Sequence, residues 1–423
     1  MSGGRGLWIA CAILVLLTVC LVAACMSDRD EKQDVPGDDD DDDDDDDSGD
    51  VDDPIPPVGG DPLSWSDPMQ IAPADAEEPC IKIRDAETVH ATYYLPLPVK
   101  GPHGLLYWLP LTGDSLEPGE PVFAAAEAYN AFWEYDGEHI EMIGSRDTQV
   151  VLLLSDDGGQ SWTQGDAVQN DRGFNCPGNP AAWYTRDSAG RMIMAFGYEY
   201  FNAVFGCTNY VHFSRLVDGE WSESVSAGLG LASAIFTAPD ERIVIVGTYA
   251  VFVSSDDGES FTEVPDGDTT RTQVRGTDAA RMPDGSVWIV DGYMWGDGYA
   301  LGVIASDPEV QSWTSPYWVL DYNDFLICLP RIKVDGDNVV VAWLASEADE
   351  IEEKQYVIRG YSRISRDRGQ TWSEKSRIGP LESGVRFQNL SLDAAGGRAV
   401  VIYNAGGGET YGEGGVFVST AEY

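Results

Sequence analysis

Three copies of one carboxylate-bearing motif are the first residues of this chain that suggest chemistry. In each copy an Asp follows a Ser by two positions, a Gly follows the Asp by two, and an aromatic residue lies three positions further on. The copies are Ser155, Asp157, Gly159 and Trp162; Ser254, Asp256, Gly258 and Phe261; and Ser365, Asp367, Gly369 and Trp372. An Asp side chain can bond backbone amides within a tight turn, and Gly supplies a positive φ. Three copies therefore argue for a fold before they argue for an activity.

A second set of candidates combines aromatic rings with carboxylates. Aromatic faces stack on the C–H surfaces of pyranose rings, and carboxylates bond sugar hydroxyls. The alternative interpretation is that these rings pack inside the fold. The ligand-binding candidates are Tyr198, Glu199, Tyr293, Trp295, Asp297, Glu409 and Tyr411.

Other catalytic arrangements are missing from the sequence. The four histidines are scattered, without the paired spacing of a metal site. There is no Gly-x-Ser-x-Gly elbow and no phosphate-binding loop. Gly406–Gly408 lacks the following helix that would make it an anion site. We therefore predict no metal and no cofactor.

The elements that must position these candidates are strands. From about residue 62, short runs rich in Val, Ile, Tyr, Phe and Trp alternate with Asp/Gly turns, and no long segment has helical periodicity. A hairpin, a third strand and an outer strand that begins with an aromatic residue recur as a unit. The third strands are predicted to end 40 to 59 residues apart, a spacing that suits the four-stranded blades of an all-β propeller; these ends are Ser155, Ser214, Ser254, Ser306, Ser365 and Ser419.

The two ends of the domain are predicted to share one blade. The chain stops soon after Ser419, and no outer strand is left for the last unit. Near the start, Trp65–Pro73 resembles Trp372–Pro380, the outer strand after the third motif. We predict that this N-terminal strand closes a ring of seven blades, so that no open edge remains. Six blades is the alternative, if residues 81–118 are an elaboration.

The motifs and their strands resemble the Asp-box (BNR-repeat) β-propellers, a superfamily that includes the sialidases. The resemblance covers most of residues 62–423. It implies that Asp157, Asp256 and Asp367 are structural residues on the blade rims, away from any active site. It also implies that ligands bind at the opposite end, over the central channel. The aromatic and acidic candidates fall in loops of that end.

Sialidases of this superfamily hold a substrate carboxylate with three arginines and attack with a Tyr nucleophile. The resemblance offers catalytic positions at Arg84, Arg275, Arg386 and Tyr403. The Arg-Ile-Pro sequence of the family is absent, however, because Asp85 and Ala86 follow Arg84, and no Glu-to-Arg spacing matches. Arg331 is an alternative that lies deeper in the channel or at the wrong end. We favour arginines that pair with carboxylates for structural reasons.

The N-terminus resembles a bacterial lipoprotein signal. Arg5 precedes an apolar run that is short for a membrane span and ends in Val22-Ala23-Ala24-Cys25, which resembles a lipobox. This implies a signal peptide over residues 1–24 and a lipid on Cys25; the alternatives are an ordinary signal peptide or an uncleaved anchor. Met26 gives no inner-membrane retention signal, so we predict the outer membrane of a bacterial cell envelope.

Residues 25–61 are predicted to be a tether between the anchor and the propeller, which spans 62–423. Ten consecutive aspartates, Asp38–Asp47, cannot bury a core and repel one another. Calcium binding by this run is the alternative. Four cysteines remain beyond the tether, an even number that is compatible with disulfides. Propeller geometry places Cys176 and Cys207 at the same end of one blade, and we predict that they pair.

The charge balance excludes several partner classes. With 26 basic and 72 acidic residues, the net charge of −46 argues against nucleic acid and against charge-driven binding to anionic membranes. We predict a monomeric, lipid-anchored propeller outside the cytoplasm that binds a glycan or a cell-surface protein. The alternatives are an exo-sialidase-type glycoside hydrolase and a non-catalytic scaffold.

Overall fold

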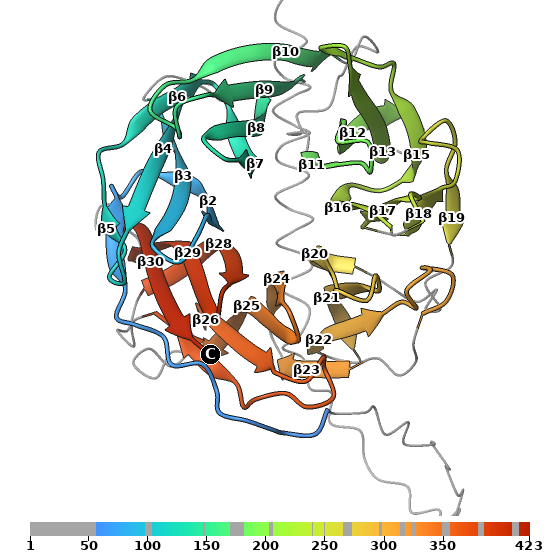
Figure 1. The fold of residues 1–423 in the computed structure, drawn as a ribbon. Helices are drawn as coiled ribbons and strands as arrows, with labels where there is room; N and C mark the ends of the chain where they lie inside the picture. Colours follow the sequence, from blue (N-terminus) through green and yellow to red (C-terminus); the bar gives the residue numbers. More distant parts are fainter. Residues whose placement is uncertain are drawn as a thin grey trace, which may run out of the picture. The chain divides into compact units, whose positions relative to one another are not determined.

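The computed structural model describes residues 56–97, 104–146, 149–169, 182–202, 206–238, 240–248, 250–264, 273–295, 298–313, 318–323, 326–348, 356–379, 385–407 and 414–423. All of these residues belong to one compact unit, Asp52–Tyr423. They form seven antiparallel sheets arranged in a ring, and the first strand of each sheet is innermost (Figure 1). The predicted seven-bladed β-propeller is therefore confirmed.

The first three blades follow one another along the chain. Blade 1 contains β2 (Glu77–Ile83), β3 (Thr88–Pro96), β4 (Gly104–Thr112) and two short outer strands, β5 (Glu117–Pro118) and β6 (Val122–Ala126). Blade 2 contains β7 (Tyr129–Asp136), β8 (His139–Arg146), β9 (Gln149–Ser155) and β10 (Thr163–Gln169). Blade 3 contains β11 (Ala182–Arg186), β12 (Met192–Asn202), β13 (Gly206–Val217), β14 (Glu220–Trp221) and β15 (Val225–Leu229). Residues 81–118 thus belong to a full blade, which excludes the six-bladed alternative.

The remaining blades complete the ring. Blade 4 contains β16 (Ala232–Thr237), β17 (Ile243–Gly247), β18 (Val251–Ser254) and β19 (Thr262–Val264). Blade 5 contains β20 (Gln273–Arg281), β21 (Val287–Trp295), β22 (Gly298–Ala305) and β23 (Trp318–Asn323). Blade 6 contains β24 (Ile327–Asp335), β25 (Asn338–Ala348), β26 (Tyr356–Ser365) and β27 (Ser376–Ile378). Blade 7 contains β28 (Val385–Ala395), β29 (Arg398–Gly407), β30 (Gly415–Glu422) and β1 (Met69–Ala72).

The N-terminal strand closes the ring as predicted. β1 pairs antiparallel with β30, and Met69 lies opposite Val418. Ahead of β1 the chain also crosses blade 6, where the Gly59 amide donates to the Trp372 carbonyl at 2.8 Å and the Trp372 amide donates to the Pro57 carbonyl at 3.0 Å. The Trp65 indole donates to the Ser362 hydroxyl at 2.8 Å. The N-terminal segment therefore ties blades 6 and 7 together, and its contacts begin before residue 62.

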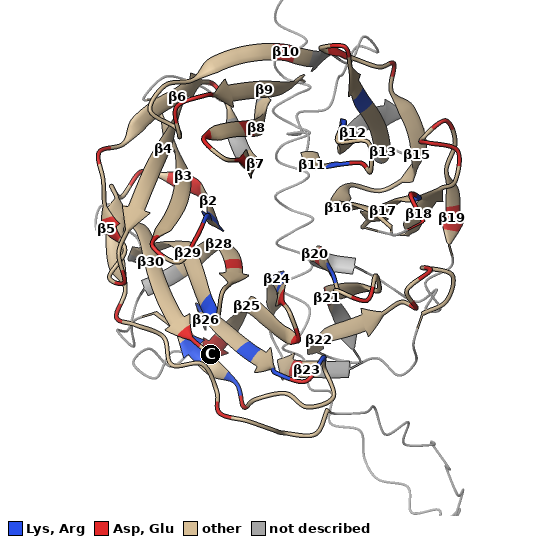
Figure 2. Ribbon diagram, viewed as in Figure 1, with Lys and Arg blue, Asp and Glu red and all other residues tan. Residues whose placement is uncertain are grey.

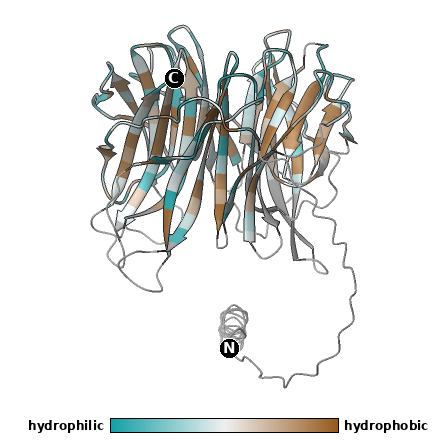
Figure 3. Cartoon of the chain, turned by 90° about the horizontal axis from the view of Figure 1, so that it is seen from below, coloured by the Kyte–Doolittle hydropathy of each residue, from teal (hydrophilic) through white to brown (hydrophobic). Residues whose placement is uncertain are grey.

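The core lies between the faces of neighbouring blades, and Figure 3 shows hydrophobic residues along the strands of the blades. Val244 and Val246 of blade 4 pack with Ile289 of blade 5, and on its other face Ile245 packs with Phe213 of blade 3. Because both faces of a blade are covered, its central strands are continuous apolar runs rather than alternating ones. Among the described residues no helix is long and apolar enough to cross a membrane.

The three Ser-Asp-Gly turns (155–162, 254–261 and 365–372) share one hydrogen-bond pattern. In the third, the Ser365 hydroxyl donates to Asp367 Oδ1 at 2.8 Å and accepts from the Gly369 amide at 2.7 Å. Asp367 also accepts from the amide and hydroxyl of Thr371 at 2.9 and 2.7 Å. Equivalent bonds form in the other two turns. Hydrogen bonds, led by those from Ser161 and Ser260, lower the pKa of Asp157 and Asp256 to about 2.

The glycine of each Ser-Asp-Gly turn abuts an aromatic ring of the preceding blade. A Cβ on Gly159, Gly258 or Gly369 would overlap the ring of Trp108, Phe213 or Trp288 respectively. All three glycines also have positive φ values, between 76° and 93°. The spacing of the motif predicted the turn; the contact with the neighbouring blade was not predicted.

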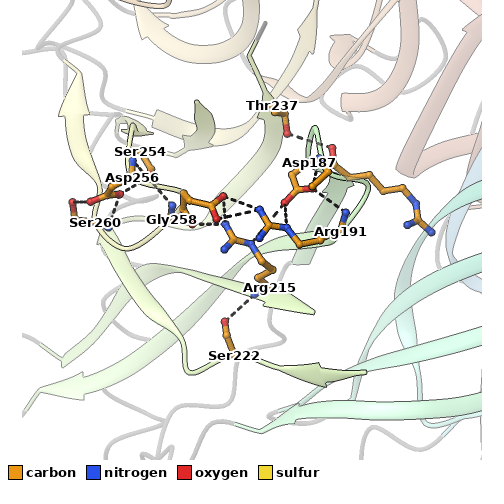
Figure 4. Close-up of polar contacts among 12 residues, drawn as sticks. Asp187, Arg191, Arg215, Ser222, Thr237, Ser254, Asp256, Gly258 and Ser260 are labelled. Atoms are coloured by element: carbon orange, nitrogen blue, oxygen red, sulfur yellow. Dashed lines mark hydrogen bonds and ion pairs between the residues drawn. The ribbon is translucent and has the colours of Figure 1, made fainter. Parts of the chain in front are cut away.

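Ion pairs connect blades at the same end of the ring as these turns. Asp257, in the second turn, accepts from Arg191 Nη2 at 3.0 Å and from Arg215 Nη2 at 2.6 Å, both of blade 3 (Figure 4). Arg191 Nε also donates to Asp187 at 2.7 Å. The rim of Ser-Asp-Gly turns is therefore joined from blade to blade by charged side chains whose partners are already in place.

Candidate functional site

The first strands of all seven blades line a central cavity of about 340 Å³, here called the channel. Its lining combines aromatic rings with charged and hydroxyl-bearing side chains. The aromatic members are Phe132, Trp133, Trp183, Tyr184 and Phe236, and the polar members are Cys80, Lys82, Glu134, Thr185, Asp278, Arg331, Lys333, Ser391 and Asp393. The channel is the concave site that the fold offers to a ligand.

Irregular pairing near the start of the first strands helps to shape this region. Among the described residues, the register shifts within the opening residues of β2, β7, β16, β20, β24 and β28. The shift in β24 lies between Cys328 and Arg331 and includes Leu329, which has a φ of 50°. A bulge of this kind bends a strand and turns its side chains to a new direction. Because the Ser-Asp-Gly turns lie at the other end of the ring, all of these shifts are at the end of the first strands that is remote from the turns.

Two opposite charges in the channel form an ion pair with each other. Lys82 Nζ lies 2.5 Å from Glu134 Oε2 on the neighbouring blade and donates to the Trp133 carbonyl at 2.9 Å. Both residues are partly exposed, and an ion pair with this exposure contributes little to stability.

Two further carboxylates of the channel are bound to backbone amides. Asp278 accepts from the Ile332 amide at 3.0 Å, and Asp393 accepts from the Ile83 amide at 2.7 Å. Each bond joins the first strand of one blade to the first strand of the next. These acids therefore tie the inner wall together.

Arg331 and Lys333 supply the remaining charges of the wall. Both lie on β24, and Figure 2 shows basic residues on β2 and β24 at the centre of the ring. Arg331 Nη1 donates to the Pro330 carbonyl at 2.9 Å. Within the part of the chain that the structure describes, neither residue forms an ion pair.

Cys80 borders the channel close to Ser391, whose hydroxyl lies 3.7 Å from the sulfur atom. Burial raises the pKa of the Cys80 thiol, and Ser391, Lys333 and Arg331 oppose that rise. Cys80 and Cys328 form no disulfide among the described residues.

The structure describes the side chain of one of the three predicted arginines. Arg84 follows the last residue of β2 and donates to Glu138 Oε1 at 2.6 Å, beside Gly158 of the first Ser-Asp-Gly turn. Arg275 and Arg386 lie near the starts of β20 and β28, at the opposite end of parallel-running first strands. Their side chains lie outside the described part of the structure, so their role stays a prediction. Arg84 is instead a partner in a rim ion pair.

Tyr403 lies in the interior of blade 7. Its side chain is fully buried and stacks on Phe387 and Phe417, with ring centroids 4.4 and 5.9 Å away. Burial raises the pKa of Tyr403 to about 12. These contacts are those of a core residue, and the channel lining does not include it.

The remaining predicted residues stay predictions. Tyr198 and Glu199 are on β12, Tyr293 and Trp295 are on β21, and the side chains of these four are not described. Asp297, Glu409 and Tyr411 lie outside the described residues, as do Cys176, Cys25 and residues 26–55 of the tether. Pairing of Cys176 with Cys207 is accordingly not tested.

Comparison with known proteins found similar solved structures only. No protein-family model and no curated protein matches the chain. Similar solved structures include an α-L-arabinanase of Penicillium chrysogenum, with 14% identity over 85% of this chain and 98% of that chain at a TM-score of 0.46. The likeness is one of fold. The propeller is likewise similar to the polysaccharide lyase Uly1 (11% identity, 81% and 89% coverage, TM-score 0.46) and to the sialidase of Trypanosoma rangeli (10% identity, 84% and 55% coverage, TM-score 0.40).

Proposed function

We propose that the chain is an Asp-box (BNR-repeat) propeller that binds a glycan in its central channel. The shared hydrogen-bond pattern of the three Ser-Asp-Gly turns supports the assignment to this superfamily. In this account the carboxylates of the turns are structural, because each is occupied by bonds within its own turn.

The observation that carries the glycan proposal is the lining of the channel. A saccharide needs an apolar surface for its C–H faces and polar groups for its hydroxyls. Trp183 packs against Phe132 with ring centroids 4.2 Å apart and ring planes tilted by 31°, and Thr185 lies two residues further along β11. Acidic and basic groups from other blades face the same cavity. A partner protein could use the same mouth, but the volume of the cavity, about 340 Å³, favours a saccharide.

The proposal also includes attachment at the cell envelope. Val22-Ala23-Ala24-Cys25 and the aspartate run that follows support a lipid on Cys25 and an acidic tether at the outer membrane. Replacing Cys25 with Ser should abolish incorporation of labelled fatty acid in a bacterial host. Continued incorporation would contradict the anchor.

Binding is favoured over hydrolysis. The sialidase alternative requires three arginines that converge, and Arg84 is committed to Glu138 at the rim. Tyr403 is enclosed by its aromatic neighbours. Fluorogenic sialosides and neutral glycosides test this directly: we expect no release of the aglycone.

A cavity-filling variant tests the site itself. The full chain is applied to a glycan array with Thr185→Trp, which places a bulky ring in the channel, and with Thr262→Trp on the exposed outer strand β19 as the matched control. We expect retention of the wild type and the control on the same glycans and loss of retention for Thr185→Trp. Equal retention of all three would exclude the channel, and no retention of the wild type would favour the scaffold alternative.

A further inference from the structure

Arg331 and Lys333 are placed on the same side of β24 by strand geometry. Successive side chains of a strand point to opposite faces, so residues two apart share a face. Ile332 between them is fully buried, and its amide donates to Asp278. Both cations therefore face the channel while Ile332 anchors the strand between blades 5 and 6.

The three carboxylates that line the channel form no ion pair with Arg331 or Lys333 among the described residues. Glu134 pairs with Lys82, and Asp393 accepts the Ile83 amide. Asp278 accepts the Ile332 amide through Oδ2, while its Oδ1 has no hydrogen-bond partner among the described residues. Within the described residues, Arg331 and Lys333 thus form no ion pair, although both side chains are partly buried. An unneutralised charge in a partly buried position is costly unless something else compensates it.

The composition of the channel is unusual for this chain. Its charged lining holds three basic and three acidic residues. In the whole chain 26 basic residues face 72 acidic ones. The channel therefore has a higher proportion of basic residues than the chain as a whole. Since the net charge of the chain repels anions, the channel is the part of the described structure that is best suited to bind one.

We propose that Arg331 and Lys333 bind an anionic group, a carboxylate or a sulfate, in the channel. Guanidinium and ammonium groups form their strongest hydrogen bonds with such groups, and Arg adds a planar fork of donors. The anionic group can belong to an acidic saccharide or to a free anion. With an acidic saccharide, the inference rests on the proposed glycan binding; with a free anion, it is independent of that proposal.

The first arm of the test compares matched saccharides. Oligogalacturonides and the same oligosaccharides with their carboxyl groups reduced to alcohols are titrated calorimetrically into the full chain. The channel variant is Arg331→Gln/Lys333→Gln. The control, Arg366→Gln/Arg368→Gln, removes two charges at the third Ser-Asp-Gly turn, where Arg368 pairs with Asp337. We expect the wild type and the control to bind the acidic form about tenfold or more tightly than the reduced form, and the channel variant to lose the preference.

The second arm uses sodium sulfate alone. The Tm of each protein is measured in sodium sulfate and in sodium chloride of equal ionic strength. General salting effects act on all three proteins, whereas a bound anion adds stability only where its site exists. We expect a smaller rise in Tm for the channel variant than for the wild type and the control.

The outcomes separate this inference from the proposed function. Equal binding of acidic and reduced saccharides by the wild type would overturn the anion site and leave glycan binding intact. If the wild type binds neither saccharide, the glycan proposal fails for these ligands and the sulfate arm decides. A sulfate effect that is lost only in the channel variant would then support a free-anion site, and equal rises in all three proteins would overturn it.

Discussion

The rim of Ser-Asp-Gly turns and the channel both contain acidic and basic residues, but these residues serve different purposes in the two regions. At the rim, Asp256 is bonded within its own turn, and neighbouring Asp257 is held by Arg191 and Arg215. In the channel, side chains from seven separate strands meet around an open volume, and Arg331 and Lys333 have no acidic partner among the described residues. A charge whose partner is built in stabilises the fold, while a charge without one is available to a ligand.

The rim and the channel also differ in how far apart their residues lie in the sequence. A Ser-Asp-Gly turn is complete within eight residues, so it folds locally and identically three times. The channel exists only after the N-terminal strand has closed the ring. Damage to the rim should therefore reduce stability, and damage to the channel should reduce binding.

The largest expected effect comes from the rim glycine Gly369. Its φ is 76°, and a Cβ would overlap Trp288 of blade 5. Gly369→Ala should lower the free energy of unfolding by about 2–5 kcal/mol, because backbone strain adds to overpacking. The matched control is Gly336→Ala in blade 6, where φ is 62° and no atom lies within 4 Å of the added Cβ. Urea unfolding should show a loss of only about 1 kcal/mol for the control; equal losses would contradict the contact between blades.

A pH effect of similar size is expected from His90, between blades 1 and 2. Burial, with the nearby Arg84 cation, lowers the pKa of His90 to about 4, and its Nδ1 lies 2.9 Å from the Tyr135 hydroxyl. In the unfolded chain His90 takes up a proton as the pH falls below about 6.5, whereas in the folded chain it stays neutral until about pH 4. The free energy of unfolding therefore decreases as the pH falls from 6.5 to 4. The loss should approach about 3 kcal/mol.

The variant His90→Gln keeps a polar partner for Tyr135 and removes the titration. Urea unfolding at pH 7 and at pH 4 should show a smaller difference for this variant than for the wild type. The same difference in both proteins would mean that other groups carry the acid sensitivity.

A smaller acid effect is expected from the turn carboxylates. Hydrogen bonds hold the pKa of Asp157 and Asp256 at about 2, below the value of about 3.9 in an unfolded chain. Their stabilisation is therefore present above pH 4 and is lost as the pH falls toward 2. Asp157→Asn/Asp256→Asn should flatten the stability profile in this window, as followed by circular dichroism. An unchanged slope would show that the turns do not depend on the charge of these residues.

The smallest effect is expected from an exposed rim ion pair. Arg368 Nε lies 2.6 Å from Asp337, and the two side chains are 48% and 60% exposed. Arg368→Ala should change the free energy of unfolding by less than about 1 kcal/mol, and less still at high salt. A large, salt-independent loss would show that rim ion pairs, and not only turn geometry, hold the blades together.

Much of the fold could be predicted because its signals are local. The spacing from Ser365 to Trp372 fixes a turn, and the likeness of Trp65–Pro73 to Trp372–Pro380 indicated the closing strand. The packing of Gly369 on Trp288 could not be read in this way, since the two residues belong to different blades.

The candidate site was harder to predict because it is built across the ring. Lys82 and Lys333 come from strands far apart in sequence, and only ring closure brings them to one cavity. The alternation of Arg331, Ile332 and Lys333 in an apolar strand was the available signal. Arg84 resembled a site arginine by its position after an apolar strand, but β2 ends at Ile83, which places Arg84 in the hairpin turn at the rim.

The most direct test of the division between rim and channel measures binding and stability in the same two variants. Thr185→Trp fills the channel, and Gly369→Ala strains the rim. With a glycan retained on the array, calorimetry should show lost binding for Thr185→Trp with a nearly unchanged urea midpoint. Gly369→Ala should bind the glycan as tightly as the wild type does, at urea concentrations below the lowered unfolding midpoint of the variant. The reverse pattern, with binding lost in Gly369→Ala and kept in Thr185→Trp, would contradict the account.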